Sequence, residues 1–251
     1  MGHIAFQHVT RRFDNGHEAL CDVSVEFADG SMSFLTGHSG AGKSTFLKLL
    51  LRADKPTRGK VLVNDVDIAT LAEQRLPRYR QHLGVVFQDH NLLSQRSIFD
   101  NIALPLRVMG MREREVGRRV RASLTQVELL GKGNLFPRHL STGEQQRVGI
   151  ARAVVTRPKI LLADEPTGNL DPELSTHIMD LFARFNQVGT TVIIASHDIQ
   201  LIDAMGLRVL RLEQGRVVDD RPATRSVADV TGVEPVAGTS AEHEAEDTGG
   251  S

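Results

Sequence analysis

The chain has 251 residues, 40% hydrophobic and 24% charged, with a formal net charge of −1. These values are typical of soluble globular proteins, and they exclude a strongly basic nucleic-acid-binding protein, so no nucleic acid is expected as a partner. A single cysteine, Cys21, excludes an intrachain disulfide framework. No stretch reaches the about 18 uncharged apolar residues that are needed to cross a bilayer. We therefore expect a cytosolic protein that contacts a membrane mainly through a partner.

Short apolar or β-branched runs predict strands, and segments of helical periodicity predict helices between them. The predicted strands are 4–9, 23–27, 32–36, 61–63, 83–87, 160–163, 191–195, 208–212 and 216–218, and the predicted helices are 43–52, 144–155 and 173–185. Several of the strands are continuously apolar, as in parallel sheets that are covered on both faces. The alternation of strand and helix indicates the α/β class.

Two regions depart from this alternation. Residues 98–138 show consecutive helical patterns with no strand between them, which indicates a helical insertion. Residues 226–251 contain six acids and no Lys or Arg, and no periodicity from 230 onward, so a disordered acidic tail is expected. Six arginines lie between residues 107 and 121 of this helical region. They form either a solvated helix face or a surface for anionic lipid; they are Arg107, Arg112, Arg114, Arg118, Arg119 and Arg121.

Polar side chains follow four of the predicted parallel strands. Residues 37–45 follow the strand 32–36, Gln88 follows 83–87, Asp164 and Glu165 follow 160–163, and His197 follows 191–195. In open parallel sheets, ligands bind beyond the carboxyl ends of the strands. The sequence therefore predicts one site built from four loops.

The first of these loops, GHSGAGKST, matches the pattern G-x-x-x-x-G-K-[ST] between a strand and a helix. Its glycines allow successive backbone N–H groups to surround phosphate oxygens, and the following helix adds the positive end of its dipole. Lys43 would span the β- and γ-phosphates, and the Ser44 hydroxyl would bind Mg²⁺. The alternative is a chance glycine-rich turn. The residues expected to bind the nucleotide are Gly37, His38, Ser39, Gly40, Ala41, Gly42, Lys43, Ser44 and Thr45.

Two adjacent carboxylates after a buried strand repel each other unless a cation or a proton compensates them. Asp164 would hold Mg²⁺, and Glu165 would act as the general base on the attacking water; a helix cap is the alternative for this pair. His197 would contact the γ-phosphate, and Gln88 would contact Mg²⁺ or the water. Taken alone, His197 and Gln88 would be read as ordinary hydrogen-bonded or solvated side chains.

The segment 140–147 (LSTGEQQR) precedes an apolar-periodic helix. Ser141 and Glu144 form an S-x-x-E capping box pattern. Two interpretations remain open: the segment is only a well-capped helix start, or its free N–H groups form a second anion site.

In this order and spacing, the motifs resemble those of the ATP-binding-cassette (ABC) ATPases, over essentially residues 3–220. They are similar to the Walker A loop (37–45), the Q-loop (Gln88), the signature (140–146), Walker B (164–165), the D-loop (170–171) and the switch histidine (His197). The resemblance implies a P-loop NTPase fold with a RecA-like parallel core sheet and an N-terminal antiparallel β subdomain. The ATPase domain would span 1–225, with a helical subdomain inserted at about 98–158, and the tail would span 226–251.

The resemblance also implies ATP and Mg²⁺ as cofactors and a head-to-tail homodimer that forms on ATP binding. The signature of one subunit (Ser141, Thr142, Gly143 and Glu144) would then act in trans. Its Ser141 and Gly143 would meet the γ-phosphate held by Lys43 of the other subunit. Thr142 stands where the family usually has a second glycine, and a β-branched residue restricts the backbone there.

Two further roles come from the resemblance. Phe13 falls where an aromatic side chain stacks on adenine, and Asp171 falls in the D-loop. The details at His38 and in the segments 87–90 and 143–155 resemble bacterial cell-division cassettes. This implies an integral membrane subunit, a peripheral location on the cytoplasmic side of the bacterial inner membrane, and control of septal peptidoglycan hydrolases. The alternatives are the ATPase of a lipoprotein-release or macrolide exporter, or a scaffold without enzymatic activity.

Overall fold

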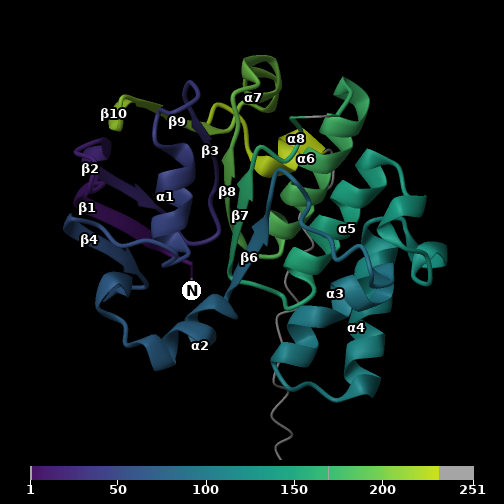
Figure 1. The fold of residues 1–251 in the computed structure, drawn as a ribbon. Coiled ribbons are helices and arrows are strands. Elements are labelled where there is room, and N and C mark those ends of the chain that lie inside the picture. The colour runs from purple at the N-terminus through teal and green to yellow at the C-terminus, as the bar shows by residue number, and fades with distance from the viewer. Residues whose placement is uncertain (1, 169, 232–251) are drawn as a thin grey trace, which may run out of the picture.

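The computed structural model describes residues 2–168 and 170–231 (Figure 1). The strands are β1 (Ile4–Arg12), β2 (Glu18–Phe27), β3 (Met32–Thr36), β4 (Arg58–Val63), β5 (Val66–Asp67), β6 (Leu83–Val86), β7 (Ile160–Asp164), β8 (Thr191–Ala195), β9 (Arg208–Glu213) and β10 (Arg216–Arg221). The helices are α1 (Lys43–Leu50), α2 (Leu76–Arg80), α3 (Ile98–Val108), α4 (Glu113–Gln126), α5 (Thr142–Val154), α6 (Pro172–Gln187), α7 (Ile199–Met205) and α8 (Val227–Thr231). Short 3-10 turns occur at η1 (Ile68–Thr70), η2 (Glu73–Arg75), η3 (Leu130–Lys132) and η4 (Pro137–His139).

The larger sheet has six strands in the order β10-β9-β3-β8-β7-β6. Strands β9, β3, β8, β7 and β6 run parallel, and β10 joins the edge antiparallel to β9. Successive residues of a strand point to opposite faces: Phe34 and Leu161 belong to one buried cluster, and Leu35 and Leu162 to the other. Both faces are covered, which explains the continuous apolar runs. The predicted α/β fold is confirmed.

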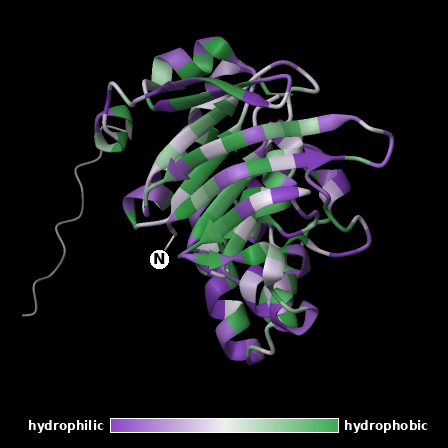
Figure 2. Cartoon of the chain, turned by 90° about the vertical axis from the view of Figure 1, so that its left-hand side faces the viewer, coloured by the Kyte–Doolittle hydropathy of each residue, from purple (hydrophilic) through white to green (hydrophobic). Residues whose placement is uncertain are grey.

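The smaller sheet is antiparallel and has the order β2-β1-β4-β5. It shares a buried cluster with α1 and with one face of the larger sheet. Within this cluster, the rings of Phe6 on β1 and Phe46 on α1 stack with their centroids 4.0 Å apart. In Figure 2, hydrophobic residues run through the strands and hydrophilic residues occupy the outer turns. Helix α1, which begins where the glycine-rich loop ends, is therefore held between the two sheets.

Helices α3, α4 and α5 lie on the other side of the larger sheet, and the described structure contains no strand between residues 98 and 138, as predicted (Figure 1). Asn101 on α3 is fully buried. It accepts a hydrogen bond from the Leu93 N–H (2.7 Å) and donates to the carbonyl oxygens of Leu93 (3.1 Å) and Ser97 (2.9 Å). These bonds fix the segment that follows Gln88 to the start of α3.

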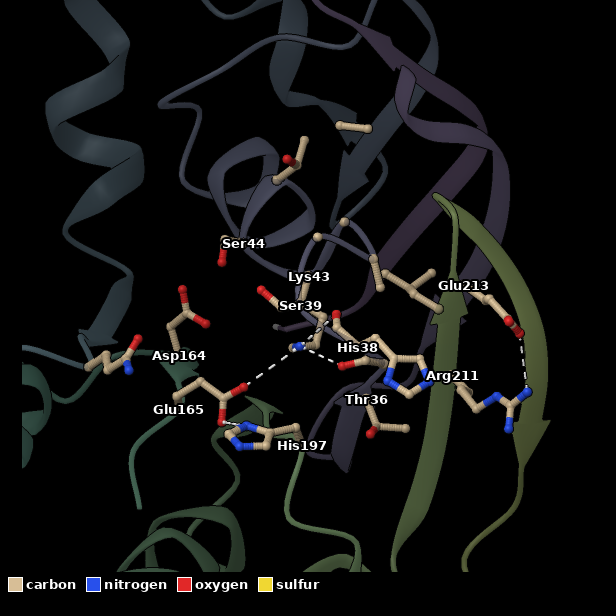
Figure 3. A pocket seen from close by; sticks show the side chains of 18 of the residues that line it. Thr36, His38, Ser39, Lys43, Ser44, Asp164, Glu165, His197, Arg211 and Glu213 are labelled. Atoms are coloured by element: carbon tan, nitrogen blue, oxygen red, sulfur yellow. Dashed lines mark hydrogen bonds and ion pairs between the residues drawn. The ribbon is translucent and has the colours of Figure 1, made fainter. Parts of the chain in front are cut away.

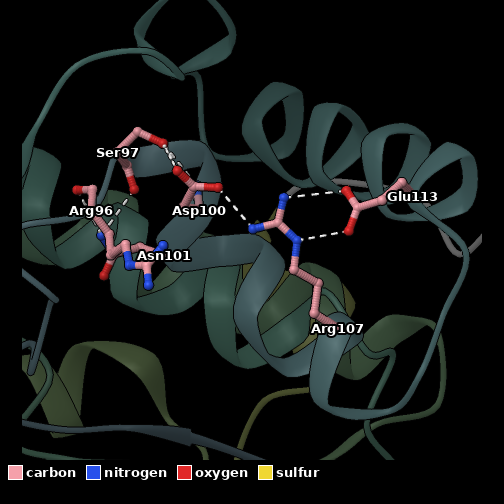
Figure 4. Close-up of polar contacts among 6 residues, drawn as sticks. All are labelled: Arg96, Ser97, Asp100, Asn101, Arg107 and Glu113. Atoms are coloured by element: carbon pink, nitrogen blue, oxygen red, sulfur yellow. Dashed lines mark hydrogen bonds and ion pairs between the residues drawn. The ribbon is translucent and has the colours of Figure 1, made fainter.

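Several of the arginines in the helical region are paired with carboxylates. Arg107 joins α3 to α4 by bonding Asp100 (2.8 Å) and Glu113 (2.9 Å), as Figure 4 shows. Arg118 and Arg119 both contact Glu115. Such pairs are usual on solvated helix faces, so the structure favours that interpretation over a lipid surface.

The segment expected to be a disordered tail from 226 onward forms a short helix, α8, over its first residues. The Ser226 hydroxyl accepts a hydrogen bond from the Asp229 N–H (3.2 Å), which caps the helix start. Val227 and Val230 pack against the large buried cluster. The prediction was therefore wrong for residues 226–231, because a capped turn with two apolar residues is too short to show periodicity. The predicted disorder of 232–251 lies outside the described residues.

Among the described residues, no helix has the length and apolar character required to span a bilayer.

Candidate functional site

A cavity of about 620 Å³ lies at the carboxyl ends of β3, β7 and β8, where the sequence predicts the site (Figure 3). Most of the predicted site residues line it, namely Phe13, Gly37, His38, Ser39, Gly40, Ala41, Gly42, Lys43, Ser44, Thr45, Gln88, Asp164, Glu165 and His197. The remaining predicted residues are not part of the lining and lie at the starts of α5 and α6, namely Ser141, Thr142, Gly143, Glu144 and Asp171.

The glycine-rich loop requires glycine at two of its positions. Gly37 and Gly42 have φ angles of +147° and +110°. A Cβ atom at Gly37 would lie 2.3 Å from the carbonyl oxygen of Leu212, and one at Gly42 would lie 2.5 Å from that of Ala19. Gly42 precedes α1 without a side-chain cap. The first N–H groups of α1 are therefore available to an anion in the cavity.

The Lys43 ammonium lies across the loop and is almost buried. It donates to the carbonyl oxygens of Gly37 (2.7 Å) and His38 (3.3 Å), and its Nζ lies 3.7 Å from Glu165 Oε1. A cation in this position faces the same space as the free amides of α1. The cavity floor is therefore suited to a group with several negative charges.

Glu165 turns back into the cavity because its backbone is left-handed, with φ of +48°. Such a conformation is uncommon for residues other than glycine, and here the Glu165 N–H donates to the Ala195 carbonyl at 2.9 Å. Its Oε2 atom lies 2.8 Å from Nδ1 of His197. The His197 side chain is 68% exposed, so its other ring nitrogen remains open to a ligand.

Asp164, the last residue of β7, has a raised pKa, because burial disfavours its charged form and the charge of Glu165 adds to this effect. A hydrogen bond with Ser44 and the nearby Lys43 charge act in the opposite direction. A divalent cation would remove the penalty on the ionised carboxylate. The oxygens of Asp164, Ser44 and Gln88 are donors that suit Mg²⁺, which keeps several waters and needs few protein ligands.

We predict that Asp164→Asn stabilises the ligand-free protein near neutral pH. The folded pKa of Asp164 lies above the ordinary value of 3.8, so ionisation of this group opposes folding. The destabilisation is complete at pH values above the folded pKa and disappears at pH values below 3.8. A neutral amide avoids that penalty. Thermal unfolding midpoints of both proteins, measured without nucleotide or divalent cation, should differ at about pH 7 and converge as the pH falls. A lower midpoint for the variant at neutral pH would contradict the prediction.

The predicted capping box is present at the start of α5. The Ser141 hydroxyl accepts from the Glu144 N–H (3.3 Å), and the Ser141 N–H donates to Glu144 Oε2 (3.0 Å). Ser141 and Thr142 are exposed. Asp171 caps α6 by accepting from the Leu174 N–H at 2.9 Å. In the single chain, this region therefore forms an exposed surface outside the cavity.

The starts of α5 and α6 are packed against each other. A Cβ atom at Gly143 would lie 2.1 Å from Leu174 Cδ2, so glycine is needed there for packing as well as for any approach of a ligand. The buried Gln146 side chain donates to the Pro166 carbonyl at 2.7 Å. Sequence reasoning missed the role of Gln146, because its partner lies 20 residues away along the chain.

The rim of the cavity contains residues that sequence reasoning also missed, namely His17, Arg211 and Glu213. The Arg11 guanidinium lies 4.7 Å from the centre of the Phe13 ring and is held by Asp54 at 2.8 Å. The ring of His17 is nearly parallel to that of Phe13, with the centroids 6.2 Å apart. Phe13 is thus a supported ring at the cavity edge, with about a third of its surface exposed.

Comparison with known proteins decides the family. A family model described as ABC transporter matches residues 20–168. The cell division ATP-binding protein FtsE of Escherichia coli (strain K12) is 50% identical over 214 residues, which cover 85% of this chain and 96% of the relative. The chain belongs to the FtsE branch of the ABC transporter family. FtsE of Mycobacterium tuberculosis (strain ATCC 25618 / H37Rv) is 49% identical over 218 residues, covering 86% of this chain and 95% of the relative.

Among solved structures, the ABC cassette MJ0796, described as a dimeric post-hydrolysis state bound to ADP and Pi, matches with a TM-score of 0.81. It is 33% identical, and the match covers 89% of this chain and 100% of that chain. The present chain, as a member of the FtsE branch, is an ATP-binding and ATP-hydrolysing subunit. The predicted P-loop fold and the predicted ATPase activity are therefore confirmed, and a scaffold without enzymatic activity is excluded.

Proposed function

We propose that this ATPase acts in bacterial cell division, together with an FtsX-like integral membrane subunit, on the cytoplasmic side of the inner membrane, in the control of septal peptidoglycan hydrolases. The observation that carries the proposal is the 50% identity to FtsE of Escherichia coli, which covers 96% of that relative. The side chains to which we assign phosphate binding and water activation, Lys43, Glu165 and His197, line one cavity of the chain. The alternative is the ATPase of a lipoprotein-release or macrolide exporter.

In the proposed reaction, the loop amides and Lys43 bind the triphosphate, and Phe13 stacks on adenine. Ser44, Asp164 and Gln88 would hold Mg²⁺, which when bound offsets the negative charge of the phosphates. Lys43 exchanges its contacts with the Gly37 and His38 carbonyls, and with Glu165, for phosphate oxygens. The short distances from Lys43 Nζ to the two carbonyl oxygens and to Glu165 Oε1, at most 3.7 Å, support this exchange.

Once Lys43 has moved to the phosphates, Glu165 is free to accept the proton of the attacking water. His197, at 2.8 Å, holds the carboxylate of Glu165 in position and presents its exposed nitrogen to the γ-phosphate. The placement of a base with a hydrogen-bonded orienting partner is a common device of proton-transfer catalysis.

We also propose that ATP closes a head-to-tail homodimer in which Ser141, Thr142, Gly143 and Glu144 cover the partner's nucleotide, with Asp171 nearby. The exposure of Ser141 and Thr142 supports this, as does the dimeric form of MJ0796. Because Ser141 already caps α5, the remaining amides of the first turn can donate to a phosphate. Thr142 narrows the approach of that phosphate without blocking the amides.

The membrane subunit is proposed to bind the segment 87–108, which follows β6 and leads into α3. Four large apolar residues are exposed there, namely Phe87, Leu93, Leu104 and Val108. They adjoin Gln88, which lines the cavity. A movement of Gln88 on nucleotide binding would therefore be transmitted to a partner bound to this segment.

The test is to purify the tagged chain from its native membrane and to identify the membrane subunit that accompanies it. We expect an FtsX-like protein, and Val108→Asp should reduce its recovery at least about fivefold, since a buried charge without a partner is strongly unfavourable. The control is Val188→Asp, on an equally exposed valine just beyond α6, which should change nothing. Recovery of an exporter permease in place of an FtsX-like protein would overturn the proposal.

A further inference from the structure

A lysine outside every recognised motif is bound to the start of α5. The Lys132 ammonium, on the turn η3, donates to Glu144 Oε1. The other carboxylate oxygen, Oε2, accepts from the Ser141 N–H at 3.0 Å. Both oxygens of Glu144 are therefore occupied. The pKa of Glu144 is lowered, chiefly by Lys132 and then by Ser141, so the carboxylate is ionised at neutral pH.

The position of Lys132 is fixed by the segment that carries it. Leu129, three residues earlier, is buried in the large core cluster, and the Lys132 N–H donates to its carbonyl at 2.9 Å. One turn further along α5, Arg147 pairs with Glu128 at 3.6 Å. Two ion pairs of opposite polarity thus join the connection between α4 and α5 to the first two turns of α5.

Glu144 creates an electrostatic conflict in the proposed dimer. A carboxylate in the first turn stabilises a helix start, and Glu144 completes the capping box. The same carboxylate would lie close to the partner's triphosphate, and like charges at short range repel each other. Lys132 resolves this conflict. It neutralises the charge of the Glu144 carboxylate and holds it against η3, while the carboxylate continues to cap α5.

We propose that Lys132 is a positioning residue for the ATP-bound dimer. It neutralises the charge of Glu144 and holds this carboxylate against η3, so that the amides of the first turn of α5 can bind the partner's γ-phosphate. This inference rests on the proposed function, in that it requires the signature to face a nucleotide held by a second copy of the chain.

The test uses ATP-driven dimerisation of the Glu165→Gln protein, measured by analytical ultracentrifugation. Adding Lys132→Met should weaken dimerisation about tenfold, since charge-assisted hydrogen bonds are among the stronger ones. ATP affinity of the monomer should not change. Lys132→Arg, which retains the charge, should dimerise within about twofold of the parent. Lys159→Met is the matched control, because Lys159 directly precedes β7 at the end of the sheet opposite to the cavity, and it should have no effect.

A second substitution separates charge from structure. Glu144→Gln removes the repelling charge and retains the capping box, so it should restore dimerisation when combined with Lys132→Met. Higher salt should also restore it in part, because salt screens the repulsion. Lys132→Gln replaces the Met variant if that variant does not fold.

Two results would overturn the inference: dimerisation of Lys132→Met at the parent's strength, or no recovery when Glu144→Gln is added. The second result would mean that Lys132 only supports the local fold. If the Glu165→Gln parent itself fails to dimerise with ATP, the proposed dimer is wrong, which is a separate outcome.

Discussion

Glu165→Gln is expected to lower ATP turnover at least about a hundredfold, the range in which general bases contribute, and to leave an ATP-bound dimer that persists. The amide has the size of the carboxylate and can still bond His197, which lies 2.8 Å from Oε2. It cannot accept a proton from water. The substitution also removes a negative charge 3.7 Å from Lys43, so ATP binding should be retained or strengthened.

The measurements are phosphate release for turnover and ultracentrifugation for the dimer, at saturating ATP and Mg²⁺. Glu115→Gln is the control, since it makes the same chemical change on α4, where Glu115 pairs with Arg118 and Arg119. The control should retain wild-type turnover. Wild-type turnover in Glu165→Gln itself would show that another group activates the water, and the role assigned to Glu165 would then be withdrawn.

The core of the cavity could be predicted from the sequence because each part of it is encoded locally. The apolar runs end directly before the glycine-rich loop and before Asp164, Glu165 and His197. In a parallel sheet, all such ends lie at one edge. No long-range information was needed to place Lys43, Asp164 and His197 around one cavity, where the structure has them.

The contacts between these side chains could not be predicted in the same way. The bond between Glu165 and His197 depends on the left-handed backbone of Glu165, which no residue preference indicates. The pairing of Lys132 with Glu144 depends on the path of the chain between α4 and α5. Asparagine is mostly found exposed, yet Asn101 is fully buried because it satisfies the backbone of a nearby loop.

Lys43→Met is expected to reduce ATP affinity at least about a hundredfold, because the lost interaction is a charge-assisted one. The fold should change little. Lys43 contributes two hydrogen bonds to loop carbonyls, at 2.7 and 3.3 Å, and those carbonyls face a cavity where water can replace it. We therefore expect the free energy of unfolding to change by about 1 kcal/mol or less.

This combination separates a binding role from a structural one. Fluorescent-nucleotide titration would give the affinity, and denaturant unfolding would give the stability of the same samples. Lys43→Arg should not rescue binding, because a planar guanidinium cannot occupy the compact position of the ammonium between the Gly37 and His38 carbonyls. Lys60→Met, at an exposed position of β4, is the charge-matched control and should bind ATP normally. If Lys43→Met retained wild-type affinity, the loop amides alone would hold the triphosphate. The contact between Lys43 and Glu165 would then be part of the resting structure only, and would not need to break before the reaction.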